Sequence, residues 1–169
     1  LEGTGRVSLA IARTPATVLD LNATLIGRDG SAVGLHGPDA VTVPMGEYRL
    51  STVTLTLADP AGGASWSYVF SDNGRRGDMV WYKVAKDGTL VLDPIGRLEM
   101  AVNLEADSPP RPDADLRINT ALYTGDGLLI VTTYRGSPAV TANEDGPCAE
   151  VSLRDGAGRV LGSTRSGFA

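Results

Sequence analysis

Few residues of this sequence have the chemistry that catalysis requires. His36 is the only histidine and Cys148 the only cysteine. A nucleophilic serine or cysteine works with a nearby base, yet no Gly-x-Ser-x-Gly motif presents a serine, and His36 lies in a Gly/Pro-rich stretch. Acidic neighbours of Cys148 disfavour the thiolate that a catalytic cysteine needs. We therefore expect a non-catalytic protein with no cofactor and no His/Cys-rich metal site.

Acidic residues are plentiful but scattered. Asp72 and Asp78 flank a predicted loop, and other carboxylates gather in the proline-rich stretch 107–115. Calcium takes about six to eight oxygen ligands at ordered spacing, and neither cluster has such a spacing. The fold could still bring two distant carboxylates together, as the hydrolysis of a glycosidic bond requires. A hydrolase with such a pair is therefore one functional alternative, ranked below the two given at the end of this section.

Aromatic residues form the one cluster that suggests ligand binding. The chain contains two Trp, five Tyr and two Phe, and five of these aromatic residues lie between positions 66 and 82. Three of them alternate at 66, 68 and 70 and share one face of a predicted strand, whereas Trp81 and Tyr82 must point to opposite sides. An outward ring could stack on a sugar while nearby carboxylates bond its hydroxyls; the other interpretation is an aromatic core with one cross-strand pair. The candidate ligand-binding residues are Trp66, Trp81, Tyr82, Asp72 and Asp78.

The composition excludes long helices and favours strands that position these residues. The 21 glycines and 10 prolines are spread along the chain, and the longest stretch free of both, 47–59, is rich in Thr, Val and Leu. In 98–105 the large apolar residues occupy every second position, which is typical of a strand with one buried face. The sequence therefore predicts an all-β fold.

One predicted strand changes the phase of its alternation. Tyr48 and Leu50 share one parity within 47–59. Val53 and Leu55 share the other. A bulge or bend near Ser51 would bring all four side chains to the same face.

Tight turns indicate how the strands pair. The chain contains Asp-Gly and Asn-Gly dipeptides, whose residues tolerate the positive φ angles that hairpin turns require. Most of these dipeptides lie between two predicted strands, so we expect antiparallel hairpins. About ten to twelve strands are enough for two packed sheets. The Asp-Gly and Asn-Gly dipeptides begin at Asp29, Asn73, Asp87, Asp126, Asp145 and Asp155.

A proline-rich stretch at 107–113 is the best candidate for a boundary. It divides the chain into a β-sandwich domain at 1–106 and a smaller β unit at 107–169. The second unit either completes the sandwich or forms a short second domain, which leaves open one sandwich or two in series.

The segment Val41–Leu50 reads V-x-V-P-x-G-x-Y-x-L. It resembles a strand of carboxypeptidase-regulatory-like and other transthyretin-like sandwich modules, and the tail from Glu150 to Leu161 resembles their closing hairpin. The resemblance implies an antiparallel immunoglobulin-like or transthyretin-like β-sandwich in which the Pro-x-Gly turn directs Tyr48 into the core. It also implies a non-catalytic module of a larger bacterial secreted or envelope protein, and it carries over no catalytic residue.

The charge balance narrows the choice of partners. With 15 Lys and Arg against 20 Asp and Glu the formal charge is −5, and the absence of a basic cluster argues against nucleic acid and anionic membranes. No apolar run approaches the roughly 18 residues of a membrane-spanning helix.

The first residue is Leu, which fits a processed or excised chain, and we expect a secreted or periplasmic location.

These features give two leading functional hypotheses. The first is a non-catalytic interaction or structural module of an extracytoplasmic protein, with a protein partner that docks at sheet edges and loop ends, near the loops 71–79 and 107–115. The alternative is a carbohydrate-binding module that uses the exposed aromatics on a polysaccharide. The oligomeric state does not follow from the sequence.

Overall fold

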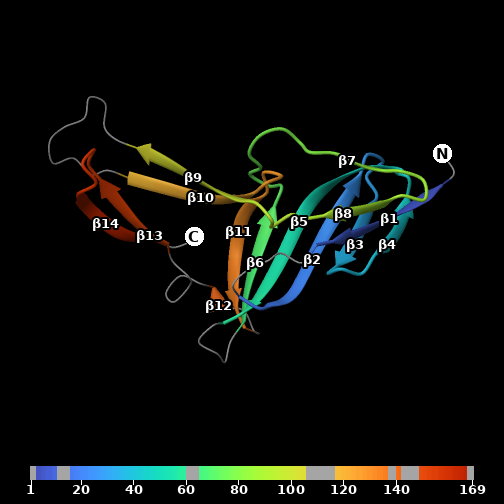
Figure 1. The fold of residues 1–169 in the computed structure, drawn as a ribbon, viewed down its shortest axis with the longest axis horizontal. Helices are drawn as coiled ribbons and strands as arrows, with labels where there is room; N and C mark the ends of the chain where they lie inside the picture. Colours follow the sequence, from blue (N-terminus) through green and yellow to red (C-terminus); the bar gives the residue numbers. More distant parts are fainter. Residues whose placement is uncertain are drawn as a thin grey trace.

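The alternating apolar sequence folds into strands throughout the described part of the chain (Figure 1). The computed structural model describes residues 3–10, 16–59, 65–105, 117–136, 140–141 and 149–166, which contain fourteen strands and no helix. The all-β prediction is confirmed. More strands form than expected because the shortest have too few residues to show an alternating pattern. The strands are β1 (Thr4–Leu9), β2 (Val18–Gly27), β3 (Ala32–His36), β4 (Val41–Pro44), β5 (Gly46–Ala58), β6 (Ser65–Ser71), β7 (Tyr82–Val84), β8 (Thr89–Leu92), β9 (Leu98–Glu105), β10 (Arg117–Thr124), β11 (Leu129–Arg135), β12 (Val140–Thr141), β13 (Ala149–Arg154) and β14 (Val160–Ser166).

Within the described residues these strands form three sheets. A small sheet has the order β4-β1-β8, and a large sheet has the order β3-β2-β5-β6-β11-β10-β9, with β7 paired to β5 and β12 to β11. Strands β13 and β14 form a separate hairpin. The sheets are antiparallel as predicted, apart from the parallel pair β1 and β8.

The predicted hairpins form at some of the turns and not at others. The dipeptides at 29–30, 126–127 and 155–156 each join two paired antiparallel strands. The prediction is wrong at 73–74 and 87–88, because β7 pairs with β5 instead of β6 and β8 pairs with β1 instead of β7. Gly74 and Asp87 do have positive φ, but turn chemistry does not dictate which strand the chain joins next. The dipeptide at 145–146 lies outside the described residues.

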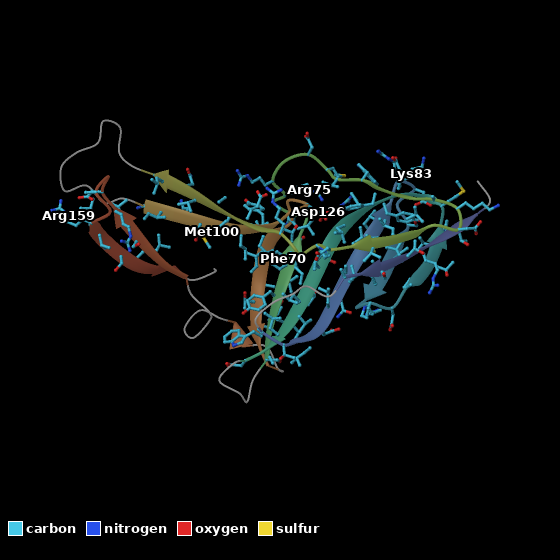
Figure 2. The ribbon with its side chains drawn as sticks, in the orientation of Figure 1. Phe70, Arg75, Lys83, Met100, Asp126 and Arg159 are labelled. Carbon is cyan, nitrogen blue, oxygen red and sulfur yellow. The ribbon has the colours of Figure 1, made fainter. Side chains whose placement is uncertain are left out.

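The core lies where the small sheet covers the β3-β2-β5 end of the large sheet (Figure 1). Alternate residues of the facing strands point into this layer and are excluded from water, which is the main force that holds the two sheets together. Phe70, labelled in Figure 2, is among the largest of these side chains. The buried apolar residues are Val7, Leu9, Leu21, Ala23, Leu25, Leu35, Val43, Tyr48, Leu50, Val53, Leu55, Phe70, Val84, Leu92, Ile95, Leu128 and Ile130.

The predicted bulge in the longest strand is present. Against β2, Thr24 pairs with Thr52 and Leu25 pairs with Leu50, so Ser51 is an extra residue on β5. Because one residue is inserted, the apolar side chains before and after it all reach the core.

The chain changes sheets between β4 and β5. β4 belongs to the small sheet and β5 to the large one, and Met45 alone separates them. As expected from the Pro-x-Gly turn, Tyr48 then enters the core, where it is 4% exposed. Its hydroxyl donates a hydrogen bond of 2.8 Å to the Pro44 carbonyl and so fixes this crossing.

The proline-rich stretch 107–113 lies outside the described residues. β9 precedes this stretch and β10 follows it, and the two strands pair along their whole length, with Leu98 opposite Thr124 at one end and Glu105 opposite Arg117 at the other. β11, which also follows the stretch, pairs with β6. The large sheet therefore continues from residues before position 106 into residues after position 107. No helix in the described part of the chain is long and apolar enough to cross a membrane.

Candidate binding surfaces

Two loops meet at one end of the large sheet. One is the connection 72–81 between β6 and β7, and the other is the turn 125–128 between β10 and β11. The Arg76 amide donates a hydrogen bond of 2.9 Å to the Gly127 carbonyl. Gly127 has a φ of 78°, and a Cβ at this position would lie 2.1 Å from the Arg76 carbonyl oxygen, so only glycine permits this approach.

Between these loops lies a pocket of about 250 Å³, which we call the turn pocket. The Arg76 guanidinium lies 5.9 Å from the centre of the Tyr123 ring, which is within the range of a weak cation–π contact. A cation, several carboxylates and an aromatic ring suit a small polar ligand better than an apolar one. The residues that line the pocket include Arg76, Asp78, Glu99, Tyr123 and Asp126.

Tyr82 links β7 to the turn 125–128 through a hydrogen bond. Its hydroxyl donates a hydrogen bond of 2.5 Å to Asp126 Oδ1. Burial, and then the hydrogen bond to the carboxylate, raise the pKa of Tyr82 above the usual value for tyrosine. The other oxygen of Asp126, Oδ2, is buried and has no hydrogen-bond partner among the described residues.

Arg75 supports the same loop from within. Its guanidinium donates to the Asp78 carbonyl at 3.2 Å and to the Leu50 carbonyl at 3.5 Å. Arg75 and Asp126 are found at the same end of the sheet in Figure 2. The loop is thus held by side chain to backbone bonds, which leaves Arg76 and Asp78 free to face the pocket.

Of the five predicted ligand-binding residues, the structure places one in the wall of this pocket and a second in contact with a pocket residue. Asp78 lines it, and Tyr82 reaches it through Asp126. Asp72 instead forms an ion pair with Arg49, which gives it a structural role.

The two tryptophans lie elsewhere. Trp81 is half-buried, and the Arg28 guanidinium lies 4.0 Å from its ring centre and covers one face. Trp66 is half-buried near the start of β6, where Leu57 is its partner on β5. Five residues of strand separate it from the loop at 72, which puts the two positions about 20 Å apart along the strand. The cluster of rings that is close in sequence is therefore divided in space.

Sequence reasoning did not identify Arg76, Tyr123 and Asp126 as site residues. Tyr123 and Asp126 lie more than 40 positions after the aromatic cluster, and the Asp-Gly pair at 126–127 indicated only a turn. No local signal could reveal that β10 and β11 return to the side of the loop at 72–81.

The described residues contain no group of three or more His, Cys, Asp and Glu side chains that could hold a metal ion. His36 is exposed at the end of β3, where its Nδ1 lies 2.6 Å from Asn22 Oδ1. Cys148 lies outside the described residues.

A second surface is formed by the two-stranded arm β9–β10. β10 pairs with β11 only at Tyr123 and Leu129, whereas it pairs with β9 along its whole length. The two strands consequently leave the main sheet as an arm, which carries Met100 in Figure 2.

The two faces of the arm differ in polarity. Paired residues of antiparallel strands share a face, so the even-numbered residues of β9 and β10 lie together. Met100 is 50% and Val102 55% exposed, whereas Leu122, nearer the sandwich, packs partly against the core. We call this surface the arm face; it continues the core side of the large sheet beyond the cover of the small sheet. Its apolar members are Leu98, Met100, Val102, Leu104, Ile118 and Leu122.

The backbone of the arm also has an open side. β9 is the last strand of the large sheet, and among the described residues only β10 pairs with it. A terminal strand of eight residues presents unpaired N–H and C=O groups to which another strand can bond.

Comparisons of the chain with protein-family models, with curated proteins and with solved structures found no match.

Proposed function

We propose that this chain is a non-catalytic β-sandwich interaction module and that the β9–β10 arm is its docking surface for a protein strand. The observation that carries the proposal is the arm face, on which the exposed apolar side chains of β9 form one stripe. Single exposed apolar residues are common on protein surfaces, but a contiguous stripe marks an interaction site. A stripe outside the core adds nothing to folding and favours association.

The chemistry of the arm indicates what kind of partner fits. The free side of β9 can bond the backbone of an added strand, and the alternate apolar side chains of β9 can pack beside those of that strand. A partner with the same alternation as β9 would satisfy both requirements. A polar or strongly charged partner would satisfy only the first.

Polar substitution of the arm face tests the proposal. In the double variant Met100→Ser, Val102→Ser, we expect the fluorescence of an apolar dye bound to the folded protein to fall several-fold. Both side chains are exposed, so the free energy of unfolding should change by only about 0.5 kcal/mol per site. The matched control is Leu19→Ser, Val91→Ser, which removes two equally exposed apolar side chains from β2 and β8.

Equal dye binding by the arm variant, the control variant and the native chain would contradict the proposal. Circular dichroism of all three proteins shows whether the fold is retained, so that a loss of dye binding is not mistaken for unfolding.

The alternative function is carbohydrate binding, and the turn pocket is the observation that favours it. There Tyr123 and Asp78 line the same pocket, which combines an aromatic ring for stacking with a carboxylate that can accept hydrogen bonds from hydroxyls. A glycan array probed with the native chain, Tyr123→Ala and Trp81→Ala tests this function. Binding that only Tyr123→Ala abolishes would support the pocket, and no binding to any glycan would exclude carbohydrate as its ligand.

We further propose that the sandwich is immunoglobulin-like or transthyretin-like and that the parent protein is secreted or belongs to a bacterial envelope. The support is the Val41–Leu50 motif together with the crossing between sheets at Met45 and the buried Tyr48. Cell fractionation of a bacterium that expresses the gene tests the location.

A further inference from the structure

We propose that the strand docked on the arm is β9 of a second copy of this chain, paired antiparallel with Ala101 opposite Ala101 across a two-fold axis. This inference rests on the proposed function, because it names the partner of the same surface. It follows from how the β9 sequence matches its own reversed sequence.

The apolar side chains of β9 match in this register. A two-fold axis through Ala101 places Leu98 opposite Leu104 of the other copy and Met100 opposite Val102. Directly opposed residues of antiparallel strands have Cβ atoms about 4.5–5.5 Å apart, so each exposed apolar side chain gains an apolar neighbour. Both arm faces then lie on the same side of one continuous sheet.

The charged side chains match in the same register. Arg97, just before β9, falls opposite Glu105 of the other copy, and the symmetry repeats the pair. Within one chain Arg97 already contacts Glu99, with 2.7 Å between Nη2 and Oε1. On β10, Arg117 is opposite Glu105. Pairing of two copies therefore extends an alternating row of charges across the polar face of the arm.

Neighbouring registers are less favourable. A shift of one residue would place the apolar residues of one copy on the polar face of the other. Moving the axis to Val102 would place Glu99 opposite Glu105, a like-charge pair that destabilises adjacent strands. Moving it to Met100 would remove both Arg97–Glu105 pairs and leave Leu104 opposite Gly96. Only the register centred on Ala101 combines apolar matching with opposite charges.

The pairing also closes on itself. A two-fold interface uses the same surface in both copies, so each free β9 edge is consumed by the other and the product is a dimer. This strand pairing gives no reason for further growth into a fibre.

Disulfide trapping tests the register. In a Cys148→Ser background, Ala101→Cys should form a disulfide-linked dimer under mild oxidation, because opposed Cα atoms lie within the roughly 4.4–6.8 Å that a disulfide spans. The control is Asn103→Cys, which is on the same face and more exposed. In the proposed register the two Asn103 positions are four residues apart, about 13 Å, and should not cross-link.

Charge reversal tests the partner. Arg97→Glu and Glu105→Arg each turn two attractive pairs of the dimer into repulsive ones, so the dissociation constant in sedimentation should rise about tenfold or more for either variant alone. In an equimolar mixture the Glu at 97 of one variant faces the Arg at 105 of the other, while Arg97 and Glu105 pair as before. The mixture should therefore recover a heterodimer of near-native affinity.

The outcomes separate this inference from the proposed function. A monomer at high concentration, cross-linking of both cysteine variants alike, or no recovery in the mixture would overturn the second copy as partner. If the arm-face serine variant still loses dye binding, the docking surface itself stands. If that variant binds dye like the native chain, both proposals fail.

Discussion

The Tyr82 hydroxyl donates a hydrogen bond to Asp126, and this bond links β7 to the turn between β10 and β11, 44 positions away in the chain. The acceptor is a carboxylate, and hydrogen bonds to charged groups are worth more than neutral ones. Removal of the donor would leave both oxygens of Asp126 without a hydrogen-bond partner in the part of the chain that the structure describes.

We therefore predict that Tyr82→Phe lowers the free energy of unfolding by about 1.5–3 kcal/mol. Tyr48→Phe, which removes a bond to a neutral carbonyl, should cost only about 0.5–1.5 kcal/mol. Urea unfolding of both variants measures the difference. A Tyr82→Phe protein as stable as the native chain would show that the bond contributes nothing net.

High pH should destabilise the protein through three tyrosines that folding buries wholly or in part. Burial raises the pKa of Tyr48, Tyr68 and Tyr82 above the ordinary tyrosine value. Below about pH 10 these phenols are protonated in both states, so their effect on stability is constant. Above that pH the unfolded chain loses its phenolic protons first, and the stability falls as the pH approaches the raised values.

Tyr82→Phe should accordingly show a shallower loss of stability between about pH 10 and 12 than the native protein. Urea midpoints measured at several pH values give this slope. A slope in the variant equal to the native slope would mean that Tyr82 ionises as readily in the folded state as in the unfolded one.

Glycine at the rim of the turn pocket should be irreplaceable. Gly127→Ala places a Cβ against the Arg76 carbonyl and also requires a positive φ, so we expect a loss of more than about 3 kcal/mol. Gly30→Ala has a similar φ of 83° but open space around it, so it should lose only about 1–2 kcal/mol. Thermal unfolding of the two variants isolates the clash, and equal losses would contradict it.

Deletion of Ser51 should be far more harmful than its substitution. Without the bulge, either Tyr48 and Leu50 or Val53 and Leu55 would point to the wrong face of β5. We expect the deletion variant to lose its cooperative unfolding transition, whereas Ser51→Ala should stay within about 1 kcal/mol of the native stability. A deletion variant that unfolds cooperatively near the native temperature would show that the register of β5 adapts.

The bulge also shows which parts of the fold are readable from sequence. A phase change in one strand is local information, and it located Ser51 correctly; the entry of Tyr48 into the core was likewise predictable from ten residues. The parallel contact of β1 with β8 was not, because neither strand carries a signal for a partner some 80 positions away.

The candidate surfaces illustrate the same limit. Asp78 and Tyr82 were identifiable as part of a polar and aromatic region, but their neighbours Tyr123 and Asp126 come from strands whose position depends on tertiary packing. The alternation of apolar residues in β9 predicts one buried face and one face in contact with water. In the structure that apolar face is exposed, because the small sheet covers only the other end of the large one.

The most direct measurement is amide hydrogen exchange at low and high protein concentration, followed residue by residue along β9 and β3. If the β9 edge binds a second copy, amides of 98–105 that face away from β10 should exchange several-fold more slowly as the concentration rises. Those of β3, the opposite edge of the sheet, should not change. Exchange along β9 that is as independent of concentration as that of β3 would contradict the arm's role as the binding edge.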